Sequence, residues 1–557
     1  MTHHPCTNPA GRLALAAALL CSGLQAQAQT APDAGRTLQE TAPPVLLPPR
    51  AAPELNLQSP LPADTAPGGP KVTLQGVSLS GNTVFSTEAL LPLLGEVRGE
   101  AFDLAGLRGL ANRITEYYRA NGYPFARAVI PAQSMQDGTL RIEVVEGRYG
   151  KVQAVGDTPL AEAAQAFLAP LKLKGSDVIE SRSLERMALI LDDQPGIRAT
   201  PIIRPGQDVG TGDLEVKIER TQAVAGEVGI DNHGNRYTGQ HRARANLDIN
   251  SPFLLGDQIT LRLLGTEQNL WLGSVGYNAP LGTSGLRGQL GYSHTAYQLG
   301  GDFANLDATG YARVSTAGLS YPLLRSQQAN LTLAGSWQHK SLNDRQGSAS
   351  TDNRKSSDAL PLTLIFDRRD NLAGGGITYG ALSWTTGQLW LDATLRATDR
   401  TSARTEGHFT KLNFDIARLQ AVDNEITLFG RVSMQWSEKN LDSSERFGLG
   451  GPSGVRAYPV GESFGDQGWL LQLEARYRLG MVTPYVFYDA GEIRTNARPW
   501  QAGNNHRFLS GSGIGLRAQQ GQWNLDATLA WRQAGGKPES DTRDNTPQVW
   551  VNAAYRF

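Results

Sequence analysis

The last ten residues of the chain alternate strictly between the two faces of an extended strand. One face carries only apolar and aromatic side chains: Val549, Val551, Ala553, Tyr555 and Phe557. The other carries Gln548, Trp550, Asn552, Ala554 and Arg556. An exposed apolar face is a liability in water, but it suits a strand that meets lipid. The pattern indicates the closing strand of an outer-membrane β-barrel. The alternative, a strand of a soluble sheet, has to be judged by repetition upstream.

The same alternation recurs through residues 221–557. Four clear segments, 242–249, 426–435, 469–478 and 523–532, place apolar residues on one face and mainly polar or charged residues on the other. Segments of about ten residues can cross a bilayer when tilted. At roughly 20 residues per strand and connection, the region predicts an all-β transmembrane barrel of about 16 antiparallel strands. We expect the polar segments 342–357 and 534–546 to form extracellular loops.

The first residues have the order of features of a secretory signal peptide. Arg12 precedes the apolar stretch 13–20, and Ala26-Gln27-Ala28 offers a small-residue cleavage site, which predicts a signal peptide over residues 1–28. A disordered, alanine-rich start is the alternative. Both cysteines, Cys6 and Cys21, lie in this segment, so the mature chain is expected to have neither thiol nor disulfide.

Residues 29–70 are rich in proline and alanine and predict an extended linker. Only a weak helical tendency is present, around residues 35–40. Two α+β units should follow, residues 71–150 and 151–220, because each contains the order strand, helix, helix, strand, strand. In the first unit Leu107, Leu110, Ile114, Tyr117 and Tyr118 fall on one helical face.

Composition and motifs exclude several classes of function. A net charge of −1 gives no compositional support for nucleic-acid binding. Beyond the N-terminal segment there is no apolar run of 18 residues, which argues against membrane-spanning helices. The glycine-rich run 511–515 lacks the strand–helix context of a nucleotide site, so we expect it to pack in a lumenal strand. We expect no catalytic residues, cofactor or bound metal, and hence no enzyme.

Several short motifs, taken in order, resemble one family. The first α+β unit carries Gly81-Asn82-Thr83-Val84-Phe85, Tyr117-Tyr118, Ala128-Val129-Ile130-Pro131 and Glu146-Gly147. The barrel region carries Asp231-Asn232, Gly256-Asp257, the run from Gly450 to Tyr458, and Phe487-Tyr488-Asp489-Ala490-Gly491. Over residues 71–557 this order resembles the two-partner secretion transporters of the TpsB, haemolysin-secretion-activation type, within the superfamily that includes BamA. The resemblance implies tandem periplasmic POTRA domains followed by the barrel.

The resemblance also implies a gating loop and its partner in the barrel wall. The loop residues are Gly451, Val455, Arg456, Ala457 and Tyr458, and the wall residues are Asp489 and Gly491. Ala457 stands where the family usually has glycine, and the plug helix of some members is not evident in the linker. Alternation points Asp489 inward, because a carboxylate facing lipid would be costly. Most loop arginines are simply solvated, but the resemblance favours pairing of Arg456 with Asp489 inside the barrel.

The resemblance implies an outer-membrane translocator of a Gram-negative bacterium that exports a large haemolysin- or adhesin-like partner protein. The resemblance implies that the POTRA domains, in the periplasm, bind the N-terminal secretion domain of the partner. The other expected partners are outer-membrane lipid and the barrel assembly machinery that inserts the protein. The alternatives are an assembly factor of the same superfamily and, from a different class, an enzyme tethered to a barrel.

Overall fold

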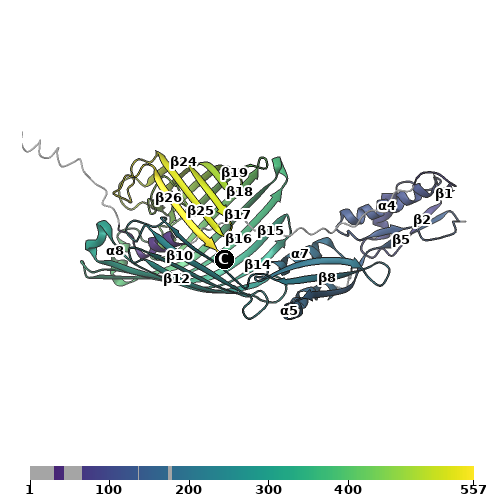
Figure 1. The fold of residues 1–557 in the computed structure, drawn as a ribbon, viewed down its shortest axis with the longest axis horizontal. Coiled ribbons are helices and arrows are strands. Elements are labelled where there is room, and N and C mark those ends of the chain that lie inside the picture. The colour runs from purple at the N-terminus through teal and green to yellow at the C-terminus, as the bar shows by residue number, and fades with distance from the viewer. Residues whose placement is uncertain (1–30, 43–65, 136, 174–177) are drawn as a thin grey trace, which may run out of the picture.

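The computed structural model describes residues 31–42, 66–135, 137–173 and 178–557. The expected signal peptide, with Cys6 and Cys21, and most of the expected linker lie outside these residues. No helix in the described ranges is long and apolar enough to span a membrane. Figure 1 shows two small α+β units in a row beside a large barrel, with the first unit farther from the barrel.

The first unit packs its helices on a three-stranded sheet of order β2-β5-β4. Its strands are β1 (Val72–Thr73), β2 (Gly76–Ser80), β3 (Ala101–Phe102), β4 (Arg127–Val129) and β5 (Thr139–Val145). Its helices are α3 (Thr87–Leu90), the 3-10 helix η1 (Leu91–Leu94) and α4 (Leu104–Ala120). The α4 face expected from the sequence packs on the sheet, with Leu107, Leu110, Ile114 and Tyr118 buried and Tyr117 partly buried.

The buried carboxylate of Glu146 is hydrogen-bonded to two other motifs of this unit. Glu146 accepts hydrogen bonds from the backbone amides of Thr83 and Val84, at 2.6 and 2.7 Å, and from the Tyr118 hydroxyl at 2.9 Å. Burial raises the pKa of this carboxyl, but these hydrogen bonds and one from the Thr83 hydroxyl outweigh it and leave the pKa below its ordinary value. Glu146 therefore remains ionised and joins the loop after β2 to α4 and the end of β5.

The second unit repeats this order with a sheet β6-β8-β7. Its elements are β6 (Arg148–Gly156), α5 (Thr158–Leu168), α6 (Pro170–Leu173), α7 (Ser181–Asp192), β7 (Ile197–Pro205) and β8 (Thr211–Arg220). Helix α7 and the turn after it contact the near end of the barrel. Arg186 donates to the carbonyl of Pro322 at 2.8 Å, and Asp193 pairs with Arg325 at 2.7 Å. These contacts attach the second unit to the barrel turns.

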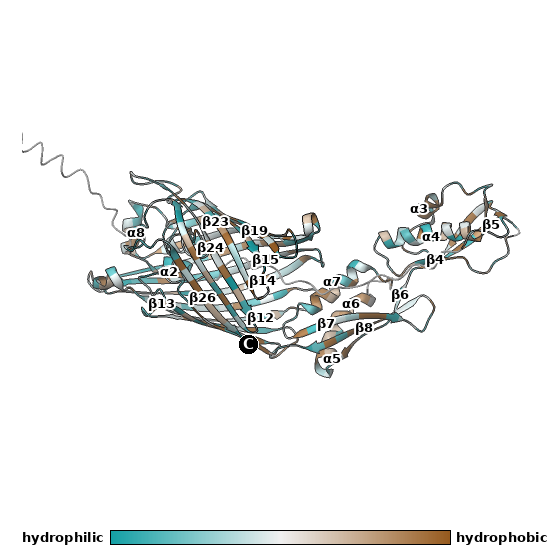
Figure 2. Ribbon diagram, turned by 45° about the horizontal axis from the view of Figure 1, so that its top comes forward, coloured by the Kyte–Doolittle hydropathy of each residue, from teal (hydrophilic) through white to brown (hydrophobic). Residues whose placement is uncertain are grey.

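Sixteen antiparallel strands close into the barrel, as the alternation predicted. They are β9 (Val224–Asp231), β10 (Arg242–Asn250), β11 (Gln258–Thr266), β12 (Trp271–Pro280), β13 (Arg287–Gln298), β14 (Ala308–Arg325), β15 (Ala329–Gln346), β16 (Thr351–Asp370), β17 (Gly376–Leu391), β18 (Gly407–Ala421), β19 (Ile426–Ser437), β22 (Gln467–Tyr477), β23 (Val482–Arg494), β24 (His506–Gln520), β25 (Trp523–Ala534) and β26 (Gln548–Arg556). Hydrophobic residues recur along the wall strands in Figure 2.

Short elements connect the strands. They are η2 (Gly301–Leu306), η3 (Leu372–Gly374), α8 (Ala393–Arg400), η4 (Ser443–Glu445), β20 (Phe447–Gly448) and β21 (Phe464–Gly465). Residues 342–357, expected as a loop, are instead the paired ends of β15 and β16 around a turn at 347–350. Backbone pairing needs no apolar face, so strands that extend beyond the membrane carry no hydropathy signal.

The closing strand β26 pairs with β9, from Asn552 opposite Asp231 to Arg556 opposite Glu227. Phe557 extends the ladder through two hydrogen bonds with Gly226, at 2.9 and 3.0 Å. On β26 the apolar face is the outer one, since Val549 and Val551 are more than two-fifths exposed. Trp550, on the opposite face, is buried inside the barrel.

Candidate functional site

The connection between β19 and β22 folds into the barrel and carries Arg456 to the inner wall. Its guanidinium forms a two-pronged pair with Asp489 on β23, with Nε 2.8 Å from Oδ2 and Nη2 2.7 Å from Oδ1. The Arg456 backbone amide also donates to Oδ2, at 3.1 Å. Both side chains are buried, so the contact expected from the sequence is present and Asp489 points inward.

Three further groups hold Arg456. Its Nη1 lies 2.6 Å from Oε1 of Glu474 on β22, and its Cζ lies 3.7 Å from the centre of the Phe487 ring. Its carbonyl accepts a hydrogen bond from Nε1 of Trp550 at 2.7 Å. Two acids, an aromatic face and an indole donor therefore surround one residue at the loop tip. Such charge-assisted and cation–π contacts are strongest where water is excluded.

The other loop residues form a small apolar core against the wall. Val455, Ala457 and Tyr458 are almost fully buried in one cluster with Leu449 and Phe487. Gly451 adopts a φ of +90°, which favours glycine, and its amide donates to the Tyr458 carbonyl at 3.1 Å. The Tyr458 hydroxyl lies 2.8 Å from the carbonyl of Ala534. The loop tip is thus a packed element fixed to several strands.

Glycines of the wall make room for this loop. A Cβ at Gly511 would lie 2.3 Å from the Cβ of Ala457, and one at Gly491 would lie 2.4 Å from Cδ1 of Leu449. A Cβ at Gly513 would lie 2.5 Å from the Phe487 ring. The run 511–515 therefore packs on the lumenal side as expected, and Gly511 accommodates the alanine that stands where the family usually has glycine.

The pair belongs to a wider ion network that sequence reasoning did not find. Glu474 also lies 2.7 Å from Arg476 and 3.2 Å from Arg517, and Arg517 pairs with Asp526 at 2.8 Å. Three arginines thus share three carboxylates. Alternation places Glu474 and Arg476 on the inner face of β22, where they pair with each other. The other partners of Glu474 are Arg456 in the loop and Arg517 on β24, and no local pattern in the chain indicates those contacts.

A helix also occupies the lumen, at the weak helical tendency around residues 35–40 within the expected linker. α2 (Ala34–Thr41) lies against β13, β14, β15 and η4, and Figure 1 shows it, in purple, inside the barrel. Asp33 caps its first turn through the Arg36 amide at 2.8 Å. The sequence left open whether a plug helix occupies the barrel, and α2 is such a helix. The helix has eight residues and few large apolar side chains, so its signal is weak outside the barrel.

Polar contacts hold both ends of α2. At the first end, Oδ2 of Asp33 accepts from the Ser443 hydroxyl at 2.6 Å and lies 3.3 Å from Nζ of Lys355. At the other end, Oε1 of Glu40 accepts from Asn235 at 3.0 Å. The second carboxylate oxygen of Glu40 is buried and has no hydrogen-bond partner among the described residues.

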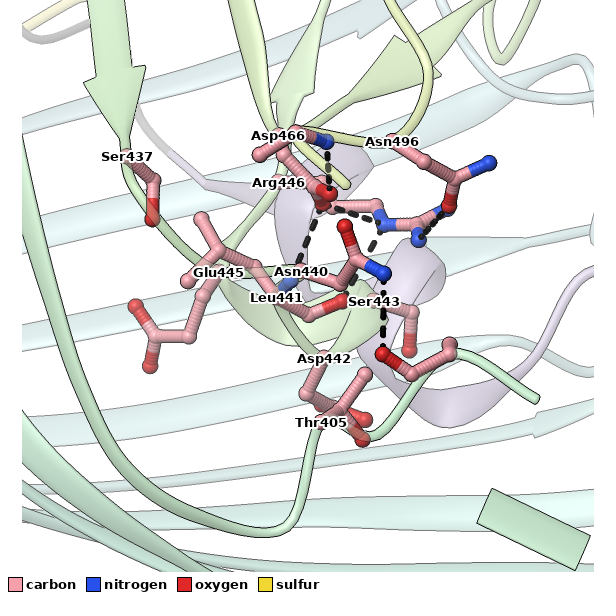
Figure 3. A network of polar contacts seen from close by, with 12 residues as sticks. Thr405, Ser437, Asn440, Leu441, Asp442, Ser443, Glu445, Arg446, Asp466 and Asn496 are labelled. Carbon is pink, nitrogen blue, oxygen red and sulfur yellow. Dashed lines mark hydrogen bonds and ion pairs between the residues drawn. The ribbon is translucent and has the colours of Figure 1, made fainter. Parts of the chain in front are cut away.

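The segment that receives α2 is itself braced by a polar network (Figure 3). Asp466 accepts from the Leu441 amide at 3.0 Å and pairs with Arg446 at 3.1 Å. These contacts hold residues 440–446 in a compact turn that includes η4, at the end of the barrel opposite the α+β units. Across the described residues, no group of three or more His, Cys, Asp or Glu side chains is placed to hold a metal.

Family models match both regions of the chain. Residues 210–518 match the family described as haemolysin secretion/activation protein ShlB/FhaC/HecB, and residues 72–147 match the ShlB-type POTRA domain. Among curated relatives, the chain is 28% identical to the heme/hemopexin transporter protein HuxB of Haemophilus influenzae strain 86-028NP, over 85% of this chain and 84% of that protein. It is 26% identical to the hemolysin transporter protein ShlB of Serratia marcescens, over 98% of both chains.

Solved structures agree on the fold. The chain aligns with CdiB from Escherichia coli at a TM-score of 0.73 and 20% identity, covering 100% of both chains. It aligns with CdiB from Acinetobacter baumannii at a TM-score of 0.65 and 18% identity, covering 91% of this chain and 94% of that one. The alternative of an assembly factor is not favoured, and the family is one of transporters. The chain belongs to the haemolysin secretion/activation family ShlB/FhaC/HecB: it is an outer-membrane two-partner secretion translocator with its POTRA domain in the periplasm.

Proposed function

We propose that the exported polypeptide passes through the barrel lumen, with the Arg456 loop as the fixed part of the gate and α2 as the part that leaves. The observation that carries this proposal is the way each segment is held. Buried ion pairs and an apolar cluster that includes Val455, Ala457 and Tyr458 hold the loop. Helix α2 contributes only Ala34 to the buried part of an apolar cluster and is otherwise held mainly by polar contacts. Water can replace polar contacts at little cost, but it cannot replace buried apolar packing.

A crosslink that prevents α2 from leaving tests this directly. The side chains of Asp33 and Ser443 are hydrogen-bonded at 2.6 Å, so Asp33→Cys combined with Ser443→Cys places two thiols within reach of a short bifunctional thiol reagent. Both native cysteines lie in the expected signal peptide, so no other thiol should interfere. Crosslinking should abolish export of the partner, while the unreacted double variant and each single variant exposed to the reagent continue to export. Normal export through a fully crosslinked barrel would refute the departure of α2.

We further propose that the periplasmic units capture the partner as it arrives. Strand β7 forms one edge of the sheet in the second unit, and β2 forms one edge in the first. An unfolded segment adding to such an edge gains main-chain hydrogen bonds without requiring a preformed site. Titration of the N-terminal part of the partner against residues 71–220 should show saturable binding. Absence of binding at roughly millimolar concentration, about −4 kcal/mol, would contradict direct capture.

The partner itself is inferred from the relatives. Two of them are named for hemolysin and for heme/hemopexin transport, which supports a haemolysin- or adhesin-like exported protein. Insertion of the barrel would depend on the cell's barrel assembly machinery, with Phe557 at the closing strand as part of its signal. Deleting Phe557 should reduce the amount of heat-modifiable barrel, and a barrel that forms normally without Phe557 would contradict that role.

A further inference from the structure

A cavity of about 650 Å³ opens at the extracellular end of the barrel, and its lining includes no residue of α2 or of the Arg456 loop tip. Its walls come from four short segments: residues 401–404 after α8, 408–410 at the start of β18, 438–440 after β19, and 498–500 after β23. We propose that this cavity binds the phosphorylated head group of a glycolipid in the outer leaflet of the membrane.

The position of the cavity matches the level of lipid head groups. Leu412 and Trp436 are paired on the outer face of β18 and β19, and both are exposed on the barrel wall. His408, Thr410 and Glu438 continue this outer face toward the extracellular end and line the cavity. Outward-facing tryptophans mark the boundary between hydrocarbon and head groups. The cavity therefore begins where the acyl chains end.

The cavity carries an excess of positive charge. Arg404, Lys439 and Arg498 line it, against one carboxylate, Glu438. In the described part of the chain none of these three cations forms an ion pair, and the Arg498 guanidinium makes no hydrogen bond. Burial lowers the pKa of the Lys439 ammonium; the Asp399 carboxylate opposes this shift, and the neighbouring Arg498 adds to it. An anion bound among the three cations would relieve this repulsion.

The carboxylates nearest Lys439, Asp399 and Glu406, do not pair with its ammonium directly, although their negative charges partly offset its positive charge. Asp399 accepts hydrogen bonds from the backbone amides of Thr405 and Glu406, at 2.8 and 3.0 Å. Glu406 pairs with Arg396 at 2.6 Å. The Lys439 ammonium donates to the carbonyl oxygens of Glu406 and His408. These bonds hold its charge at the wall without cancelling it.

A buried asparagine fixes two walls of the cavity against each other. The Asn440 amide group donates to the carbonyl of Ala403 at 2.8 Å and to that of Arg498 at 2.9 Å. Its side-chain oxygen accepts from the Arg498 amide at 2.7 Å. Figure 3 shows Asn440 beside the network around Asp466. The arginine-bearing segments are therefore preorganised, and Trp500 at the rim offers a flat surface for a sugar ring.

The test measures binding of bisphosphorylated lipid A to the purified full-length protein, stripped of native lipid, by native mass spectrometry and equilibrium titration. Arg404→Glu combined with Arg498→Glu should weaken binding by about tenfold or more, because two charge-assisted contacts become repulsive. Arg345→Glu combined with Arg543→Glu is the matched control. It makes the same change of charge at two exposed arginines elsewhere in the extracellular segments and should bind normally.

Other probes separate a lipid head group from a free anion. Dephosphorylated lipid should bind the wild-type protein as weakly as lipid A binds the double variant, and excess inorganic phosphate should not displace lipid A. Equal binding of lipid A by the double variant and the control would overturn the proposal. Inorganic phosphate binding as tightly as lipid A would overturn the lipid assignment. If charge reversal prevents heat-modifiable folding, Arg404→Gln with Arg498→Gln is measured instead, with the same criterion of weaker binding than the control.

Discussion

The two segments inside the barrel, the Arg456 loop and α2, are held by different kinds of contact. The loop buries Val455, Ala457 and Tyr458 in an apolar cluster and surrounds Arg456 with two carboxylates. The helix contributes Ala34 to its own apolar cluster, with Ala31 and Leu38 only partly buried against it. The other contacts between α2 and the barrel are mainly hydrogen bonds and an ion pair. The loop is therefore packed as part of the wall, whereas the helix is the occupant that we propose leaves the lumen.

The difference lies in what each segment loses on leaving. If the Arg456 guanidinium leaves its carboxylates, buried charges remain without partners in a site that water solvates poorly, which is strongly unfavourable. Polar groups that reach water exchange one set of hydrogen bonds for another, and the net change is small. The variants below change how firmly the Arg456 loop or α2 is held in the barrel, and they run from the largest expected change in free energy to the smallest.

Breaking the central pair should give the largest effect. Arg456→Ala or Asp489→Ala leaves the other charge buried without its main partner, which costs about 3–5 kcal/mol. Each variant should impair export of the partner while a heat-modifiable barrel remains in the membrane. The double variant should be less impaired than the sum of the two, because the interaction is lost only once.

A matched control exists in the same barrel. Arg418 pairs with Asp370 at 2.9 Å, but both side chains are about one-third exposed. Arg418→Ala should cost only about 0–1 kcal/mol and leave export intact. Strictly additive defects at Arg456 and Asp489, or wild-type export by Arg456→Ala, would show that the buried pair does not hold the loop.

The next effect concerns packing of the loop tip. Gly511→Ala would place a methyl group 2.3 Å from the Cβ of Ala457, which should displace the loop at a cost of about 1–3 kcal/mol. Ala457→Gly removes the obstructing group and restores the residue that the family usually has, so it should rescue Gly511→Ala. Export and protease accessibility of the loop are the measurements. A defect of Gly511→Ala that persists in the double variant would place the clash elsewhere.

Local alternation was enough to predict the barrel and the inward direction of Asp489, because strand geometry sends alternate residues to opposite faces. It did not identify Trp550 or Glu474 as partners of Arg456, since alternation gives the face of a strand residue but not which loop residue folds in to meet it. The sequence indicated α2 only as a weak helical tendency around residues 35–40 and did not place it in the lumen, because the stability of α2 depends on a capping aspartate and on the lumen around it. The family resemblance supplied the pairing of Arg456 with Asp489, which residue patterns alone left open.

A smaller effect is expected at the first end of α2. Asp33→Ser retains a side chain that can cap the helix but removes the charge that faces Lys355. Lys355 is buried but keeps Asp442 at 2.7 Å, so its charge is not left unpaired and the loss should be about 1.5 kcal/mol. The helix should leave more often, which would appear as more frequent open-channel events in planar bilayers. Thr41→Ala is the control, because that hydroxyl bonds only within α2 in the described contacts. Equal conductance of the two variants would mean that the Asp33 contacts do not retain the helix.

The smallest expected change is an increase in the stability with which α2 is bound, at its second end. One carboxylate oxygen of Glu40 is bonded to Asn235, and the other is buried without a partner among the described residues. Burying a charge with so little compensation is unfavourable, so Glu40→Gln should bind the helix more tightly, by a few tenths to about 1 kcal/mol. Open-channel events should become rarer than in the wild type and export slower. If Glu40→Gln instead opens the channel as Asp33→Ser does, then the Asn235 contact anchors the helix, and the second end of α2 is as firmly held as the first.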